Sequence, residues 1–289
     1  MPMKGPRGLF VRIVVVVSLI GVGFWLRTLQ SATGITGGQR WLPWSKTTMV
    51  TLYFSDGRFL FPVSHRMQED GDLPRAALQA LLNGPSAADL DNPVPRGVQL
   101  HSFVLENGLA HVNLSAPPGD RAATAIIETL TALRGVRSVE LSVGGQRLGV
   151  PATRTPLLYF ASARGLVAVP VNAAKPREAL ETYLSGPPSP DITGLPPDVR
   201  LLAYDYNSAD RVLSLRFSYT SSLRALAMDR PDRMRTVLLG LIASLTEFPE
   251  VRAVRLDFGG QTRLGLGQCS DLLRTPQTRP VLLNDERLL

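Results

Sequence analysis

An internal repeat constrains the fold of this chain more than any other feature. Three segments recur in the same order along the 289 residues: Leu52-Tyr53-Phe54 as Leu158-Tyr159-Phe160, Ala77–Pro85 as Ala179–Pro187, and Val139–Gln146 as Val254–Gln261. Solenoid repeats have periods of about 20–50 residues, whereas this unit spans about 100 residues, which is the size of a domain. The sequence therefore predicts a tandem duplication of one domain.

Each unit is predicted to contain two short strands, a helix, a β-hairpin, a second helix and a last strand. The expected strands are Met49–Phe54, Arg58–Val63, Val98–Leu105, Leu109–Leu114 and 139–143, then Leu157–Phe160, Leu166–Val171, Val199–Tyr206, Val212–Phe217 and 254–258. Pro74 and Pro176 mark the starts of the first helices. Because the last strands alternate apolar and polar residues, we expect both helices on one face of a mostly antiparallel sheet. The predicted fold class is α+β in two tandem repeats, and the extra segment 219–232 is expected to extend a helix or add a turn.

The amino-terminal residues 9–26 read LFVRIVVVVSLIGVGFWL, an apolar run that contains one charge, Arg12. The part after Arg12 is short for a membrane span, but an arginine that reaches the headgroups extends it. Since no A-x-A cleavage site follows, we predict a single N-terminal transmembrane helix, with a cleaved signal peptide as the alternative. Both interpretations place the rest of the chain outside the cytoplasm, beyond a linker at 28–48.

The net charge of +7 does not indicate nucleic-acid binding. Lys4, Arg7, Arg12 and Arg27 lie in the first 27 residues, which contain no acidic residue, and removing these four charges leaves +3 for the rest of the chain. The remaining arginines are interleaved with acidic residues rather than grouped in a basic stripe. The mean hydropathy of +0.07, with 44% hydrophobic residues, also excludes a disordered chain and a polytopic membrane protein.

The sequence offers no constellation that indicates catalysis or a cofactor. His101 and His111 flank the Asn107-Gly108 turn and are expected to meet across the hairpin, but two imidazoles without a third ligand make a poor metal site. Cys269 has no partner thiol and is interpreted as a spectator. With no nucleophile elbow, P-loop or acid pair shared by the repeats, we predict no enzyme, no metal and no cofactor.

One strand pair is a candidate partner surface. If Leu213 faces the helices, alternation sends Arg216 to the opposite face of the sheet, and cross-strand pairing is expected to bring Tyr204 and Tyr206 there. Tyrosine and arginine are enriched at binding hot spots. The alternative is another strand register, in which Tyr204 packs in the core.

The ordered motifs resemble those of the GerMN domain of sporulation and spore-germination proteins. The pattern A-L-x-x-L-L-x-G-P, then P-x-x-V, a hairpin, and V-x-L-x-x-G-G-Q begins at Ala77 in the first unit. GerM-like proteins carry two such domains in tandem behind a membrane-targeting segment. The resemblance implies a ring-building-motif-like α+β fold and a non-enzymatic role in an envelope assembly.

Together these observations predict an anchor at 1–27, a linker at 28–48, GerMN-like domains at 49–149 and 155–266, and a tail at 267–289. The predicted function is an extracytoplasmic scaffold or assembly factor of the bacterial envelope, in sporulation or spore germination. It would be held at the cell membrane and work through contacts with envelope or sporulation proteins. Self-association is left open. The alternative is an exported protein that binds or cleaves cell-wall glycans.

Overall fold

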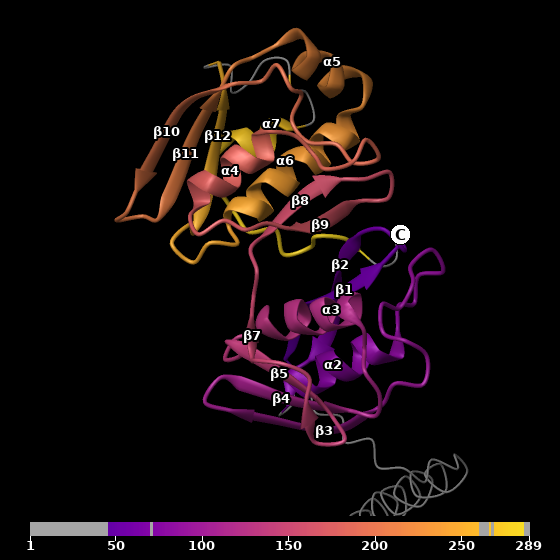
Figure 1. The fold of residues 1–289 in the computed structure, drawn as a ribbon. Coiled ribbons are helices and arrows are strands. Elements are labelled where there is room, and N and C mark those ends of the chain that lie inside the picture. Colours follow the sequence, from indigo (N-terminus) through magenta and orange to yellow (C-terminus); the bar gives the residue numbers. More distant parts are fainter. Residues whose placement is uncertain (1–45, 70–71, 260–265, 267–268, 286–289) are drawn as a thin grey trace, which may run out of the picture. The chain divides into compact units, whose positions relative to one another are not determined.

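Two successions of elements follow one another in the same order, as the repeat predicts (Figure 1). The computed structural model describes residues 46–69, 72–259, 266 and 269–285. Module 1 contains β1 (Thr47–Ser55), β2 (Leu60–Gln68), α2 (Leu73–Asn83), β3 (Leu100–Glu106), β4 (Leu109–Leu114), α3 (Asp120–Thr131), β5 (Ser138–Val143), β6 (Gln146–Arg147) and β7 (Ala152–Thr153). Module 2 contains β8 (Leu157–Ala161), β9 (Leu166–Pro170), α4 (Pro176–Leu184), β10 (Leu201–Asn207), β11 (Val212–Phe217), α5 (Ser221–Asp229), α6 (Pro231–Leu245), β12 (Ala253–Phe258), α7 (Ser270–Arg274) and β13 (Gln277–Thr278).

The predicted anchor and residues 28–45 of the predicted linker lie outside the described residues, whereas Thr47 and Thr48 at the end of that linker already belong to β1. Within the part of the chain that the structure describes, no helix has the length and apolarity needed to cross a membrane. Residues 45–289 form one compact unit, distinct from residues 1–44. Both modules contribute to a single hydrophobic core in this unit, so we expect it to fold without residues 1–44.

Each module has a central sheet built on three long strands: β3-β4-β5, to which β6 and β7 are added, and β10-β11-β12, to which β13 is added. The hairpin strands are antiparallel and turn at Asn107-Gly108, both with positive φ as an Asn-Gly hairpin turn requires. The sheets are mostly antiparallel, as predicted, but the last long strand is parallel to its neighbour in both modules. The reason is connectivity, because α3 and α6 each form a crossover that returns the chain in the same direction. The predicted extra segment becomes the separate helix α5, and Pro231 then begins α6.

The opening hairpin of each module does not join that module's own sheet, which corrects our expectation of one sheet per unit. Instead the two hairpins form a four-stranded sheet of order β1-β2-β9-β8, in which Leu60 pairs with Ala168. All five residues of β8 are buried, as is the second half of β1. A strand whose side chains are buried on both faces has other elements packed on both sides of its sheet, so this sheet lies in the interior.

A helix covers each outer edge of this four-stranded sheet. The backbone N–H of Tyr53 in β1 donates to Oγ1 of Thr129 in α3, at 3.2 Å. The N–H of Tyr159 in β8 donates to Oγ of Ser244 in α6, at 2.8 Å. Edge strands expose unpaired backbone groups that invite aggregation, and here two equivalent side chains each satisfy one of them, while Asp91 and Thr193 pair with Ser55 and Ala161 on the same edges. The same pair of contacts establishes that residue 129 of module 1 corresponds to residue 244 of module 2.

The carboxy-terminal segment joins the two hairpins where β2 and β9 diverge. The side chain of Asn284 donates to the carbonyls of Pro62 and Leu166, at 2.9 and 2.8 Å, and accepts from the N–H of Leu166 at 2.7 Å. Its own carbonyl accepts from the N–H of Ser64 at 2.9 Å. One buried amide thus replaces ladder hydrogen bonds between the modules, and the predicted tail is a structural part of their junction.

Replacing Asn284 by Ala is expected to lower the free energy of unfolding by about 2–4 kcal/mol, because the carbonyl of Pro62 and both backbone groups of Leu166 lose their partner. Urea denaturation of residues 45–289 measures the change. The control is Val281→Ser, at a residue of the same segment that is 73% exposed. Equal stability of the two variants would contradict the role assigned to Asn284.

Gly240 lets α6 approach β8. A Cβ at this position would lie 2.4 Å from the carbonyl oxygen of Tyr159, which is fixed backbone. We expect Gly240→Ala to destabilise the unit by about 1–3 kcal/mol, although alanine ordinarily favours a helix by about 1 kcal/mol. Thermal unfolding monitored by circular dichroism measures the effect. The matched control is Gly149→Ala, where nothing lies within 4 Å of the added carbon, and a melting temperature for Gly240→Ala no lower than that of this control would refute the explanation.

Candidate functional site

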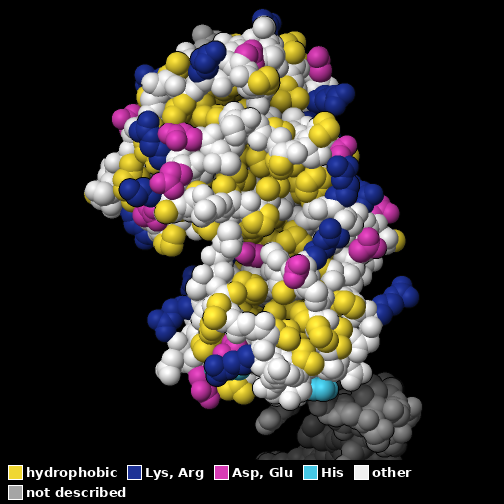
Figure 2. Space-filling model, in the orientation of Figure 1, with side chains coloured by type: hydrophobic (Ala, Val, Ile, Leu, Met, Phe, Trp, Pro, Cys, Tyr) yellow, Lys and Arg dark blue, Asp and Glu magenta, His cyan; other side chains and the backbone are white. Residues whose placement is uncertain are grey.

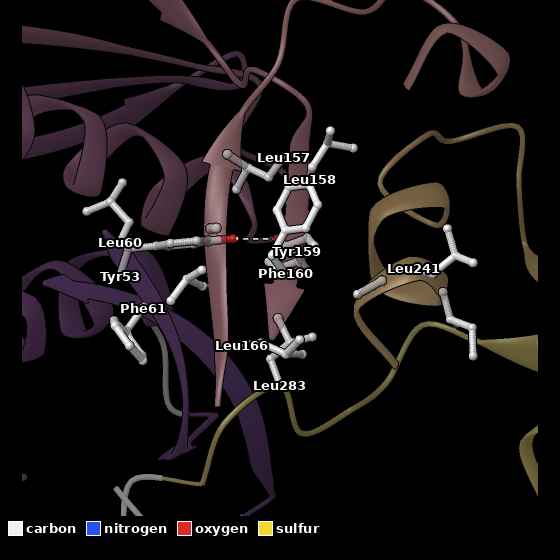
Figure 3. Packing of buried hydrophobic residues seen from close by; sticks show 14 of the residues in the cluster. Tyr53, Leu60, Phe61, Leu157, Leu158, Tyr159, Phe160, Leu166, Leu241 and Leu283 are labelled. Carbon is white, nitrogen blue, oxygen red and sulfur yellow. Dashed lines mark hydrogen bonds between the residues drawn. The ribbon is translucent and has the colours of Figure 1, made fainter. Parts of the chain in front are cut away.

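A cluster of buried polar side chains lies at the junction of the modules. This junction cluster consists of Tyr53, Glu128, Arg154, Tyr159, Glu247 and Arg279. The hydroxyl groups of Tyr53 and Tyr159, which occupy matching positions of the repeat, are 3.1 Å apart (Figure 3). Both tyrosines are fully buried. Burial raises the pKa of each hydroxyl, so both stay protonated and act as hydrogen-bonding groups.

Glu247 is the carboxylate of the junction cluster that is paired with two arginines. Its Oε1 accepts from the hydroxyl of Tyr159 at 2.6 Å and lies 2.6 Å from Nη2 of Arg279. Its Oε2 lies 2.7 Å from Nη2 of Arg154, and the side chain is only 1% exposed. Two guanidinium groups therefore compensate this buried carboxylate.

Glu128 is held less well. Its Oε1 accepts from the N–H of Thr155 at 3.3 Å, and its Oε2 lies 3.4 Å from Nε of Arg154 without a hydrogen bond of good geometry. Burial raises the pKa of Glu128 to about 7, and the nearby Arg154 only partly opposes the shift. A carboxyl that titrates near neutral pH is a feature of active sites but also of structural ion-pair networks. Since these groups come from five separate chain segments and hold them together, we interpret the cluster as a structural junction.

The register of β10 and β11 separates the three residues that we predicted on one face. Tyr204 and Tyr206 lie opposite Leu215 and Leu213, which are buried, so both tyrosines are on the side of the helices. Arg216 lies on the opposite face. The prediction of one shared face was therefore wrong, and the alternative register describes the strand pair.

Each tyrosine has an intramolecular partner on its face. The guanidinium of Arg177 in α4 lies over the Tyr204 ring, 5.4 Å from its centroid. The hydroxyl of Tyr206, at the exposed end of the strand, donates to the carbonyl of Glu250 at 2.8 Å. The hydroxyl of Tyr206 is therefore satisfied within the chain, and the Tyr204 ring is covered by a cation of the same module.

Arg216 lies in a shallow groove on the outer face of the module 2 sheet. The groove has a volume of about 430 Å³ and is lined by alternating charges, chiefly Asp205, Arg216, Arg255, Asp257 and Arg274. Nε of Arg216 lies 3.1 Å from Oδ2 of Asp257, and its side chain remains 60% exposed. The groove combines these charged groups with apolar lining from Leu215, Leu256 and Leu273. Basic and acidic side chains are also interspersed on the side of the molecule shown in Figure 2.

The predicted histidine pair does not form. His111 lies opposite Val104 across the hairpin, and its Nδ1 lies 2.9 Å from Oε1 of Glu140 on the neighbouring strand. The alternating pattern of the last strand predicts that Glu140 faces water, but Glu140 is only 7% exposed. Its Oε2 also lies 3.1 Å from Nε of Arg147. The described residues contain no group of three metal-ligating side chains. Cys269 is buried, and burial raises the pKa of its thiol.

Repeat matching missed the charged half of the junction cluster for a definable reason. Glu128 corresponds to Ala243, and Glu247 corresponds to Ala132, because residue 129 matches residue 244. The two carboxylates therefore lie at non-equivalent positions of the repeat. The only available signal was the tyrosine shared by both opening strands.

The raised pKa of Glu128 predicts a pH dependence of stability. Its ordinary value is 4.5 and its folded value is about 7, so between these pH values the folded chain binds more protons than the unfolded chain. Stability from this group is therefore lost as pH rises from 4.5 to 7, by about 1–3 kcal/mol.

Glu128→Gln mimics the protonated group and should remove this part of the pH dependence. Urea denaturation at pH 4.5 and 7.5 of both proteins gives the difference, in which the titrations of all other groups cancel. The parent should lose stability relative to Glu128→Gln as pH rises. A constant difference would show that Glu128 does not titrate in this window.

Comparisons with known proteins agree with this architecture. The family model described as Germane, sporulation and spore germination, matches residues 51–149 and 157–264. The tandem GerMN domains of the sporulation protein GerM from Bacillus subtilis are similar in fold, with 16% identity, a TM-score of 0.61, and coverage of 83% of this chain and 99% of that one. A putative lipoprotein from Clostridium perfringens matches 37% of this chain and 88% of its own length, with 23% identity and a TM-score of 0.26. No curated protein matches this chain.

The resemblance to GerMN domains is thus confirmed, and it extends over both modules. Since the family model matches more than half of the residues, this chain belongs to the Germane family of sporulation and spore germination proteins.

Proposed function

We propose that this chain is a non-enzymatic assembly factor of the bacterial envelope, acting outside the cytoplasm in sporulation or spore germination. Membership of the Germane family supports the biological setting. The apolar run at 9–26, which lies outside the described residues, supports attachment to the cell membrane as a single-pass anchor, with secretion after cleavage as the alternative. Envelope or sporulation proteins are the proposed partners.

The single observation that carries this proposal is the fusion of the two modules through one sheet. The four-stranded sheet, the junction cluster and Asn284 join the two opening hairpins. The central sheets keep one face away from their helices, so one framework presents two sheet faces to other molecules. Such an arrangement suits a protein that works by positioning partners.

Arg216 is the side chain through which we propose to test contact with a partner. It is exposed, it is charged, and its partner Asp257 belongs to the same sheet face. Arginine is prominent among interface residues whose truncation weakens binding by 2 kcal/mol or more. Tyr206, which is 41% exposed, lies on the opposite face of the sheet and is not part of this surface.

In a sporulating host, Arg216→Glu in the chromosomal gene should lower the yield of heat-resistant or germinating spores toward that of a deletion strain, because a reversed charge repels the partner group. We expect cross-linking to the envelope partner to fall about tenfold or more. The control is Arg96→Glu, the same charge reversal at an exposed position of module 1. Equal phenotypes in both variants would contradict a role for this face.

A turnover assay separates the assembly role from cell-wall chemistry. Purified residues 45–289 are incubated with peptidoglycan, and the released fragments and the bound protein are measured. The proposal expects neither fragments nor pelleting. Fragment release would establish an enzyme, and saturable pelleting would establish a glycan-binding protein.

A further inference from the structure

The two modules differ in what covers one equivalent position of their surface. This position lies beside α3 and β5 in module 1 and beside α6 and β12 in module 2. After β12 the chain forms α7 before it reaches β13, whereas after β5 it makes the short β6 turn before β7. β7 and β13 are equivalent, because they pair antiparallel with Val139 and Val254 at matching positions of the repeat. Module 2 therefore has a helix where module 1 has only a short connection.

In module 2, α7 closes this position. Leu272 and Leu273 are buried at 5% and 2% exposure, and α7 packs against β12. Both oxygens of Asp271 lie 2.8 Å from the guanidinium nitrogens of Arg235 in α6. A pair of adjacent leucines and one charge pair thus attach a short helix to the module.

In module 1, the same position is an open apolar groove of about 310 Å³. Its lining includes Ile127 from α3, Leu141 from β5, and Leu148 and Val150 from the connection to β7. Leu148 is 47% exposed and Val150 is 87% exposed, while Ile242, the counterpart of Ile127, is fully buried. Apolar side chains are visible over the α2–α3 side of module 1 in Figure 2. Exposed apolar area of this kind marks an interaction site.

The charge beside the groove is reversed between the modules. Because residue 129 corresponds to residue 244, Asp120 at the start of α3 corresponds to Arg235. Asp120 is exposed at the edge of the groove. Where module 2 holds an aspartate of α7, module 1 is complementary to a lysine or arginine.

We propose that the module 1 groove binds a short helix of a partner protein that presents two adjacent leucines and one basic residue. The leucines occupy the space between Ile127 and Val150, and the basic residue pairs with Asp120. The helix lies as α7 does on module 2, so the internal repeat serves as the template for the complex. This inference deepens the proposed assembly role by describing a partner, but the binding test below uses neither spores nor peptidoglycan and so fails or succeeds independently.

The experiment uses residues 45–289 with labelled isoleucine, leucine and valine methyl groups. The probe is a peptide of residues 266–276 carrying Cys269→Ser and Asp271→Arg, and the matched peptide keeps Asp271. At millimolar concentration the arginine peptide should shift the methyl signals of Ile127, Leu148 and Val150. It should bind about threefold more tightly than the aspartate peptide, which is the size expected for one exposed charge pair.

Two protein variants test the parts of the proposal separately. Asp120→Arg should reverse the preference, so that the aspartate peptide binds more tightly. Val150→Glu changes a side chain that is already exposed, keeps the fold and should abolish the groove shifts with either peptide. Absence of shifts with both peptides, or equal affinities in the parent and in Asp120→Arg, would overturn the proposal.

Other occupants of the groove give distinct results. Groove signals that change with protein concentration without peptide would assign the groove to a second copy. Groove signals that differ between the full chain and residues 45–289 would assign it to the segment 1–44. Either result would overturn a partner helix as the occupant.

Discussion

The hydrogen-bonded sheet shared by the two opening hairpins is the constraint on which the rest of the structure depends. A two-stranded hairpin is marginally stable by itself, and neither module provides a third strand for its own. Pairing of β2 with β9 solves this problem for both modules together. The outer edges then need cover, which Thr129 and Ser244 supply from equivalent helices. The duplication therefore produced one cooperative unit rather than two independent domains.

The junction also contains charges that an apolar interface would not need. Glu247 is compensated by two arginines, whereas Glu128 shares one of them and is poorly hydrogen-bonded. Breaking a buried ion pair costs more than the intact pair contributes, so such groups penalise incorrect docking more than they stabilise the correct one. We infer that the cluster defines which surfaces of the modules meet, and that Glu128 makes the junction sensitive to pH near neutrality.

Divergence between the repeats is concentrated where a module meets something else. The order of the main strands and helices is shared, while the second copy adds α5 and α7 and the first keeps an open groove. A duplicated domain can lose or gain a covering helix without disturbing its sheet, because the cover packs on the surface of a core that is already closed. Differences between copies therefore point to contacts more directly than shared residues do.

The sequence by itself determined the α+β class, the tandem repeat, the Asn107-Gly108 turn and most element positions, because these follow from local periodicity and turn chemistry. It did not determine the placement of the opening hairpins, since apolar strands pair equally well with either sheet. Tyr204 and Arg216 show the same limit, because one step in strand register exchanges the two faces. Only the tertiary structure brought together Glu128, Arg154 and Glu247, which lie far apart in the chain at positions that the repeat does not share.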